Sequence, residues 1–368
     1  MKINCLKKDV EESVEVASRV VSHSATLPVL RCVVFNANKN GEVEIKATNL
    51  ELGITTSFSA EVQKEGEVAV PAQILLATLK ASPQQTKVTL EVVDGSLVVT
   101  VAGAKTTIKT VSLDDFPKIP QPETKTKYSI PKEVLVKGIR SVLYSASTSL
   151  IKPELASVYV YHEDGNMVFV ATDSFRLAEK KISYKTTEEI PTVIIPIKNT
   201  TELVRILETQ PDGDLSVFID DDQYSIQREG LFVTSRIIDG SFPDYKSILP
   251  KEVNTEVIVL KEDLLTTLKK AQIFSDKFGQ ITLHIYPSKK TLTLSARNND
   301  VGEVFDSIEA TLTGDDLDIS FNHRYLVDVF QSLSTDSMSL SFAGAGRPLI
   351  IKGISDPSFI YLVMPMNR

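Results

Sequence analysis

The sequence predicts an α+β protein of three tandem similar domains, and three repeated signals support this. The stretch 68–82 (VAVPAQILLATLKAS) returns at 193–208 (VIIPIKNTTELVRILE) and at 318–334 (DISFNHRYLVDVFQSLS). Each copy is an apolar strand followed by an amphipathic helix. A second signal, EIKATNLELGI at 44–54, recurs at spacings of 124 and 125 residues, and a third, INCLKKDVEESVEVAS from Ile3, opens each unit.

Strand patterns fill most of each unit. Segments such as 87–101 and 214–236 alternate apolar and polar residues, and turns such as Asp94-Gly95 separate them, which is typical of antiparallel hairpins. Each unit adds two helices, expected to be about 10–16 residues long from the apolar periodicity. Polar, Pro-containing stretches at 119–127 and 248–256 mark the boundaries. The predicted domains are 1–120, 128–247 and 248–368.

Basic residues recur at equivalent positions of the helices. In the first helix of the second unit, Lys137 and Arg140 share one face. Four of the six compared positions in the second helices are basic and none is acidic: Gln73, Lys198, Arg324, Lys80, Arg205 and Gln331. Two interpretations stay open, ordinary solvated faces or a surface that contacts phosphates without reading bases. The first unit departs from the pattern, because Glu12 and Glu15 occupy the positions of Lys137 and Arg140.

Composition excludes several classes of protein. The net charge of −8 and pI of about 5.3 argue against a nucleic-acid binder that is basic over its whole surface. Two cysteines, Cys5 and Cys32, predict no disulfide framework and favour a cytoplasmic location. No apolar run is long enough for a membrane span, and the N-terminus lacks the apolar core of a signal peptide. We expect no metal and no cofactor.

Catalytic motifs are not expected in this chain. We find no Gly-rich phosphate loop, nucleophile elbow or paired-His metal motif in the sequence. The run 220–222 (three Asp) lies between two strand patterns and is interpreted as a hairpin tip. His323 lies at a helix start, where a capping role is favoured over general-base catalysis.

The C-terminal segment IYLVMPMNR has two interpretations. It is either a last core strand or one wall of an exposed apolar groove, where flexible Met side chains suit peptide binding.

Four segments together resemble the bacterial sliding clamps, the β subunits of the replicative DNA polymerase III. They are ATDSFRLA (171–178), SFPDY (241–245), FNHRYL (321–326) and the terminal YLVMPMNR. The resemblance covers the whole chain in register.

The resemblance implies a non-catalytic processivity subunit of DNA polymerase III. Two chains would form a head-to-tail ring of six DNA-clamp domains, with antiparallel sheets outside and the helices lining the hole. The ring would encircle duplex DNA without sequence preference and would act in the cytoplasm at replication forks. The residues implied to face DNA are Lys80, Lys137, Arg140, Lys152, Lys198, Arg205, Lys269, Lys270 and Arg324.

The resemblance also implies a groove that binds short linear motifs of partner proteins. The partners would be the polymerase III alpha subunit, the clamp loader delta subunit, other polymerases and mismatch-repair proteins. Asn322 and the main chain near Met364 would orient a partner's Gln. Two departures affect partner preference, Phe175 in place of a frequent His and Asn367 in place of a basic residue. The implied groove residues are Thr172, Ser174, Phe175, Arg176, Leu177, Pro243, Ser247, Ile248, Phe278, Asn322, Tyr325, Pro348, Leu349, Leu362, Met364, Pro365 and Met366.

A ring interface is implied at the strand 104–112. Thr106 and Ile108 would face Ile273 and Phe274 of the second copy. An edge strand of alternating Thr and Ile without Pro is a natural pairing template. Thr106 is smaller than the aromatic residue of some relatives, so we expect a weaker dimer.

The sequence leaves two other functions as alternatives to the ring. An enzyme would use a cleft between repeated domains and would lose turnover when single carboxylates change. A repeat-built scaffold without a DNA role would not be retained on circular DNA, and it leaves the repeated basic positions unexplained.

Overall fold

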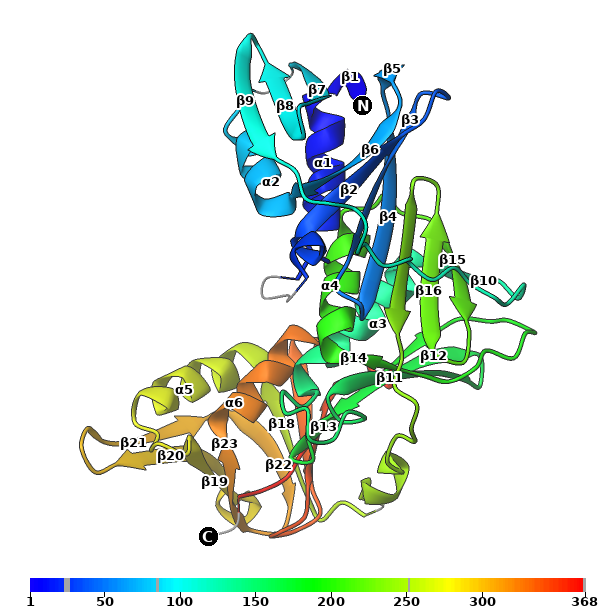
Figure 1. Cartoon of the computed structure of the whole chain (residues 1–368). Coiled ribbons are helices and arrows are strands. Elements are labelled where there is room, and N and C mark those ends of the chain that lie inside the picture. Colours follow the sequence, from blue (N-terminus) through cyan, green and yellow to red (C-terminus); the bar gives the residue numbers. More distant parts are fainter. Residues whose placement is uncertain (23–26, 84–85, 251, 367–368) are drawn as a thin grey trace. The chain divides into compact units, whose positions relative to one another are not determined.

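The computed structural model describes residues 1–22, 27–83, 86–250 and 252–366 (Figure 1). It has two compact structural units, which differ from the three repeats of the sequence and are called the first and second unit from here on. The first is Met1–Leu135 with Lys198–Asp239, and the second is Val136–Ile197 with Gly240–Arg368. No helix in the described part is long and apolar enough to cross a membrane.

The element order repeats three times, which confirms the predicted fold class. The first repeat contains β1 (Lys2–Leu6), α1 (Lys7–Ser18), η1 (Pro28–Arg31), β2 (Cys32–Ala37), β3 (Glu42–Thr48), β4 (Leu52–Ser59), β5 (Glu61–Lys64), β6 (Gly66–Pro71), α2 (Ala72–Lys80), β7 (Lys87–Val93), β8 (Ser96–Val101) and β9 (Ala104–Lys109). The second contains β10 (Tyr128–Pro131), α3 (Lys132–Val142), η2 (Leu143–Ser145), β11 (Ser157–Glu163), β12 (Asn166–Thr172), β13 (Arg176–Ser183), β14 (Val193–Pro196), α4 (Ile197–Glu208), β15 (Asp214–Ile219), β16 (Gln223–Arg228) and β17 (Leu231–Arg236).

The third repeat follows the 3₁₀ turn η3 (Tyr245–Ile248). It contains β18 (Thr255–Leu260), α5 (Lys261–Ile273), β19 (Gln280–Tyr286), η4 (Pro287–Lys289), β20 (Thr291–Asn298), β21 (Gly302–Ile308), β22 (Ala310–Gly314), β23 (Leu317–Asn322), α6 (His323–Asp328), η5 (Val329–Gln331), β24 (Ser337–Phe342), β25 (Leu349–Gly353) and β26 (Phe359–Val363).

Two helices are shorter than the sequence pattern predicts. Helix α2 has nine residues and α6 has six, against an expected minimum of about ten from apolar periodicity. After α6 the chain tightens into the 3₁₀ turn η5, where the Ser332 N–H donates to the Val329 carbonyl at 2.9 Å. Val329 and Phe330 are adjacent and both buried, so the apolar pattern continues past the end of the α-helix.

The first helix of each repeat begins with a lysine: Lys7 and Lys132 are buried, and Lys261 is half-buried. The Lys132 ammonium donates to the Gln210 carbonyl beyond α4 at 2.8 Å, and that of Lys261 donates to the Leu333 carbonyl beyond η5 at 2.6 Å. Carbonyls at a helix C-terminus lack intrahelical partners. In the second and third repeats the lysine therefore ties the start of the first helix to the end of the second, whereas Lys7 pairs with Glu11 on its own helix at 2.7 Å.

Each unit contains two antiparallel sheets. The first unit has the strand orders β5-β1-β7-β8-β9 and β10-β15-β16-β17-β4-β3-β2-β6. The second has β14-β11-β12-β13-β26-β25-β24-β18-β22 and β21-β20-β19-β23. Each larger sheet therefore joins two repeats edge to edge, through β17 with β4 and through β26 with β13.

Helices cover one face of the sheets. Helix α1 packs on α2, β3 and β4, and α5 packs on α6, β20 and β21. Gly138 inside α3 has a packing reason, since a Cβ there would lie 2.2 Å from the Phe169 ring. Close contact of helix and strand thus explains a residue that costs helix stability elsewhere.

Candidate functional site

The turn at 172–176 in the second unit exposes the side chains implied as one groove wall. The Asp173 carboxylate accepts the backbone N–H groups of Phe175 at 2.9 Å and Arg176 at 3.0 Å. Ser174 has a left-handed φ of 77°. These bonds hold the turn and leave the Phe175 side chain 59% exposed.

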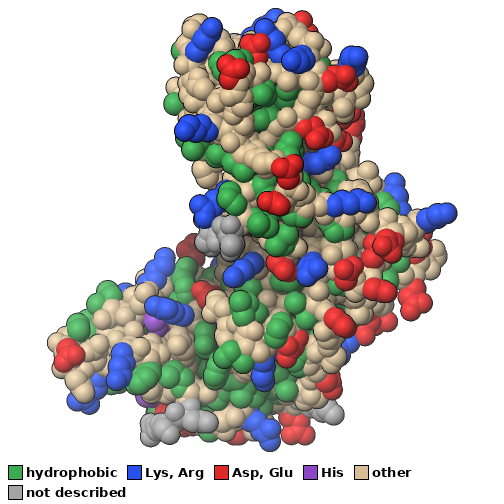
Figure 2. Space-filling view, in the orientation of Figure 1, with side chains coloured by type: hydrophobic (Ala, Val, Ile, Leu, Met, Phe, Trp, Pro, Cys, Tyr) green, Lys and Arg blue, Asp and Glu red, His purple; other side chains and the backbone are tan. Residues whose placement is uncertain are grey.

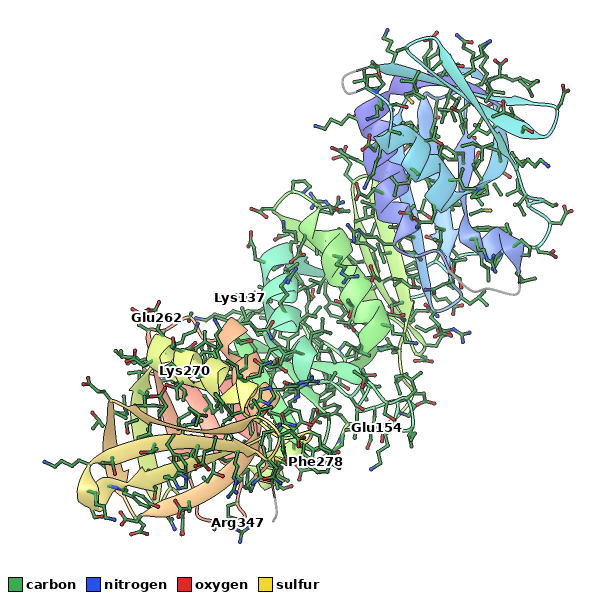
Figure 3. All side chains as sticks on the ribbon, turned by 90° about the vertical axis from the view of Figure 1, so that its left-hand side faces the viewer. Lys137, Glu154, Glu262, Lys270, Phe278 and Arg347 are labelled. Carbon is green, nitrogen blue, oxygen red and sulfur yellow. The ribbon has the colours of Figure 1, made fainter. Side chains whose placement is uncertain are left out.

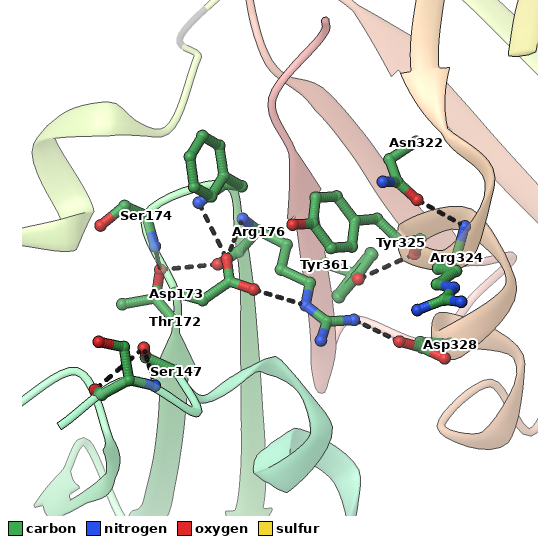
Figure 4. A network of polar contacts seen from close by, with 12 residues as sticks. Ser147, Thr172, Asp173, Ser174, Arg176, Asn322, Arg324, Tyr325, Asp328 and Tyr361 are labelled. Atoms are coloured by element: carbon green, nitrogen blue, oxygen red, sulfur yellow. Dashed lines mark hydrogen bonds and ion pairs between the residues drawn. The ribbon is translucent and has the colours of Figure 1, made fainter. Parts of the chain in front are cut away.

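Arg176 links this turn to α6 (Figure 4). Its Nε donates to Asp173 Oδ2 at 3.0 Å, its Nη1 donates to Asp328, and its guanidinium lies 4.7 Å from the centre of the Tyr325 ring. Burial opposes its charge, but Tyr361 and the two carboxylates together raise the pKa of Arg176. Arg176 therefore connects β13 to α6, and the carboxylates of Asp173 and Asp328 neutralise its charge.

A cavity of about 760 Å³ opens beside this turn. Five implied groove residues line it: Ser174, Ser247, Ile248, Pro348 and Met364. Two of its lining residues, Leu249 and Met364, pack against an apolar cluster that includes Leu177 and Leu362, each 1% exposed. In Figure 2, hydrophobic side chains gather in the lower, central part of the view, which belongs to the second unit. The cavity can take apolar side chains of a peptide.

Sequence reasoning missed seven lining residues: Leu249, Pro250, Glu252, Asn254, Ala343, Gly346 and Arg347. Two signals could have indicated them. Leu249-Pro250 repeats Ile119-Pro120 at the previous boundary, and the Gly-rich segment 343–347 interrupts two strands.

Phe278 and Asn322 line a different hollow, of about 340 Å³, together with Arg324. Asn322 caps α6, because its Oδ1 accepts the Arg324 N–H at 2.9 Å and its Nδ2 donates to the Phe278 carbonyl at 3.1 Å. The Met364 N–H likewise donates to the Phe175 carbonyl at 2.8 Å. The Asn322 amide and the Met364 N–H, two of the groups expected to orient a peptide Gln, are therefore engaged within the protein.

The remaining implied groove residues take several positions. Thr172 and Leu349 are buried, Pro243 is exposed, and Pro365 and Met366 are half-buried. The Met366 N–H donates to the Ser320 carbonyl at 2.8 Å, which fixes the end of the chain against β23. Asn367 lies outside the described residues.

The linker before the third repeat is anchored by aromatic residues that sequence reasoning did not select. Phe242 stacks on Tyr159 with ring centres 4.8 Å apart. The Tyr245 hydroxyl donates to the buried Glu179 carboxylate and lies 2.7 Å from the Tyr161 hydroxyl. Burial, and then the bond to Glu179, raise the pKa of Tyr245. The motif SFPDY, which contains two of these rings, was the available signal.

The basic residues implied to face DNA are exposed in both units. Figure 3 shows Lys137 on α3 and Lys270 on α5, with Phe278 and Arg347 on loops of the same unit. Ion pairs of the described residues engage Lys80 with Glu15 at 3.0 Å, Arg205 with Glu202 at 2.7 Å and Lys270 with Asp306 at 2.8 Å, among others. Phosphate would have to compete with these carboxylates.

The residues implied at a ring interface differ in exposure. Ile273 is 65% exposed, Phe274 is half-buried and Thr106 is exposed. Ile108 is only 4% exposed and its side chain packs within its own unit, so its place opposite a second copy stays a prediction. The other five residues of β9 are exposed.

One polar group has the distances of a catalytic triad. His284 lies 2.6 Å from Asp318 Oδ1 and 2.8 Å from Ser295 Oγ. Ser295 sits in the middle of β20, which pairs with β19 on one side and β21 on the other. The neighbouring N–H groups therefore serve the sheet and offer no oxyanion hole. No cluster that could hold a metal occurs among the described residues.

Family models match nearly the whole chain. The DNA polymerase III beta subunit models match as N-terminal domain at 1–120, central domain at 129–244 and C-terminal domain at 246–367. The chain is 28% identical to the beta sliding clamp of Synechococcus elongatus, over 100% of this chain and 99% of the relative. It is 27% identical to that of Bacillus subtilis, over 100% of both.

Solved structures of sliding clamps have the same fold over the whole length of this chain. The DNA polymerase sliding clamp of Bacillus subtilis has a TM-score of 0.93 at 26% identity, covering 100% of this chain and 99% of that one. The sliding clamp of Bartonella birtlesii bound to griselimycin has a TM-score of 0.94 at 28% identity, covering 100% of both.

Proposed function

The chain belongs to the DNA polymerase III beta subunit family, the non-catalytic sliding clamps, and from this premise we propose that two copies join head to tail into a ring around duplex DNA. The helix faces would contact the phosphates, and the groove of the second unit would bind short apolar peptides of polymerase and other replication proteins. We place the domain boundaries of the ring at 1–120, 128–247 and 248–368.

Two unpaired sheet edges carry this proposal. The last strand of the second repeat, β17, pairs with β4 of the first, and the last strand of the third repeat, β26, pairs with β13 of the second. In both joints the last strand of one repeat thus pairs with the third strand after the first helix of the preceding repeat. Two strands of these kinds have no such partner within the chain: β9, the last strand of the first repeat, and β21, the equivalent of β4 and β13 in the third. Both end their sheets, so β9 of one copy can pair with β21 of another.

The two internal joints share one register, which extends to this third joint. In both joints the first residue of the receiving strand lies opposite the fifth residue of the other strand. Leu52 lies opposite Ser235 in one joint, and Arg176 lies opposite Val363 in the other. Applied to β9 and β21, the rule places Ile108 opposite Gly302 of the partner subunit. A Cβ on Gly302 would lie 3.8 Å from the Phe274 ring, so this glycine leaves the ring accessible beside the joint.

Charge supports the same register. Thr107 would lie opposite the partner subunit's Glu303, and Lys105 and Lys109 would flank that carboxylate. Phe305 is 67% exposed on β21 and would be covered by the Lys105 side chain of the second copy. A closed two-copy ring removes both edges.

The test is the solution mass by light scattering over a concentration series. The unchanged chain should give twice the chain mass and should dissociate on dilution, because Thr106 adds little apolar area to the joint. Ile273→Ala with Phe274→Ala should give monomers, as should Ile273→Asp alone, which alters an exposed side chain and preserves the fold.

Leu150→Ala with Ile151→Ala is the matched control, since these side chains are 60% and 90% exposed in the same unit. Its mass should equal that of the unchanged chain. An undiminished dimer in both Ile273 variants would refute the interface.

A further inference from the structure

Carboxylates form ion pairs with some of the helix cations that are proposed to contact DNA. Lys80 on α2 pairs with Glu15 on α1, and Arg205 pairs with Glu202 one turn earlier on α4. These four residues belong to the first unit. Glu15, Glu202 and Arg205 also line one hollow of about 250 Å³, with Arg19. Carboxylates and cations therefore share one small surface.

We propose that Glu15 and Glu202 hold Lys80 and Arg205 away from the DNA phosphates and so keep the contact with duplex weak. The inference rests on the proposed function, in which these helices face DNA. It assigns a role to Glu15, one of the two acids that break the repeated basic pattern, and to Glu202: both compete with phosphate from inside the protein.

The exposure of the pairs makes the competition reversible. The side chains of Lys80 and Glu15 are 48% and 39% exposed, and those of Arg205 and Glu202 are 54% and 26% exposed. Exposed ion pairs contribute little stability and are screened by salt. A phosphate can displace the carboxylate, but the released carboxylate then attracts a cation from solution.

This exchange lowers the salt dependence of binding. A cation that neutralises a phosphate releases counterions and steepens the fall of log K with log salt by about 0.9 per contact. A cation that must first leave a carboxylate contributes less, because the freed carboxylate takes up a counterion. The same arrangement occurs in the second unit, where Asp306 pairs with Lys270 at 2.8 Å.

Lys198 provides the comparison, because no carboxylate of the described residues lies within ion-pair distance of it. It lies on α4 with Arg205 and is exposed. Lys198 should contribute its full share to the salt dependence, whereas Lys80 and Arg205 should not.

The experiment measures binding of the full-length chain to a short fluorescent duplex by anisotropy at several salt concentrations. Glu15→Gln with Glu202→Gln should raise the affinity several-fold at low salt. It should steepen the slope by up to about 0.9 for each released cation. The double variant should also diffuse more slowly along a long duplex.

Glu65→Gln is the control, because it removes one carboxylate from the Lys39–Glu65 pair, which lies in connections between strands of the same unit. Slopes that are equal in the double variant and the unchanged chain, while Lys198→Gln lowers the slope, would overturn the inference and leave the proposed function intact. An equal gain in Glu65→Gln would also overturn it, since net charge would then explain the effect. No response to Lys198→Gln would overturn both.

Discussion

The two linkers between repeats share a sequence pattern but form surfaces of different chemical character. Each contains a Phe-Pro pair and ends in an apolar residue followed by Pro, at Ile119-Pro120 and Leu249-Pro250. Each then lines a cavity with the connection between equivalent strands, β15–β16 in the first unit and β24–β25 in the second. The first cavity has a volume of about 540 Å³ and the second about 760 Å³.

The side chains make the difference. The first cavity is lined by Glu123 and by the acidic run 220–222. Asp220 accepts the backbone N–H groups of Glu123 at 3.2 Å and Thr124 at 2.9 Å, so a carboxylate ties linker to hairpin. The second is lined by Ile248, Leu249, Pro250, Ala343, Pro348 and Met364. One architecture therefore gives an acidic, tied surface once and an open apolar surface once, and only the second suits an apolar peptide.

The largest expected effect comes from making the second cavity resemble the first. Ile248 is 49% exposed, so Ile248→Asp should preserve the fold. A bound apolar peptide would bury the new carboxylate without a partner, at a cost of about 3 kcal/mol, or roughly a hundredfold in Kd. Titration with a short synthetic peptide carrying Gln, Leu and Phe measures this. Gln121→Asp adds the same charge to the first cavity and should leave binding unchanged; a loss in that variant, or none in Ile248→Asp, would contradict the comparison.

A smaller effect is expected from the anchor that only the second linker has. Tyr245→Phe removes the hydroxyl that donates to Glu179, a carboxylate 4% exposed with the Lys181 ammonium 3.7 Å away. The loss should cost about 2 kcal/mol of unfolding free energy. It should also weaken the peptide about tenfold, since Ser247 and Ile248 follow Tyr245 directly.

Thermal unfolding and peptide titration measure the two effects separately. Tyr159→Phe removes a hydroxyl from the same aromatic group without altering Glu179, so it is the control. Tyr245→Phe would argue against a positioning role if it lowered the stability and left peptide affinity unchanged.

The features that all three repeats share could be predicted from the sequence. Three copies of strand, helix and hairpins specify the fold because apolar periodicity alone decides which faces are buried, and the lysines that open the first helices recur with it. Helix length was predicted less well, because Val329 and Phe330 continue the apolar pattern into a 3₁₀ turn. Periodicity does not distinguish the two helix types.

The lining of the cavity could be predicted from the sequence only in part. The turn 172–176 and the C-terminal segment were found as short motifs, whereas Glu252, Asn254 and Arg347 meet only in the folded unit. The ion pair of Glu15 with Lys80 was invisible for the same reason, because 65 residues separate the partners. Equivalent positions predicted which residues share a helix face and could not predict their neighbours on another helix.

The smallest expected effect concerns pH and the second anchor of the apolar linker. Lys246 donates to both Glu163 oxygens, at 2.7 and 2.8 Å, and this hydrogen bonding lowers the pKa of Glu163 below its usual value of 4.5. Because the folded pKa is the lower one, the contact stabilises the linker above the unfolded pKa and is lost as pH falls through the folded pKa. Peptide affinity should therefore be constant from neutral pH to about pH 5 and should fall below that by less than about threefold, since the pair is exposed. Glu163→Gln should abolish the decline and Glu188→Gln, at an exposed carboxylate of the same unit, should retain it. A decline that persists in Glu163→Gln would assign the pH dependence to another group and leave Tyr245 as the anchor that distinguishes the two linkers.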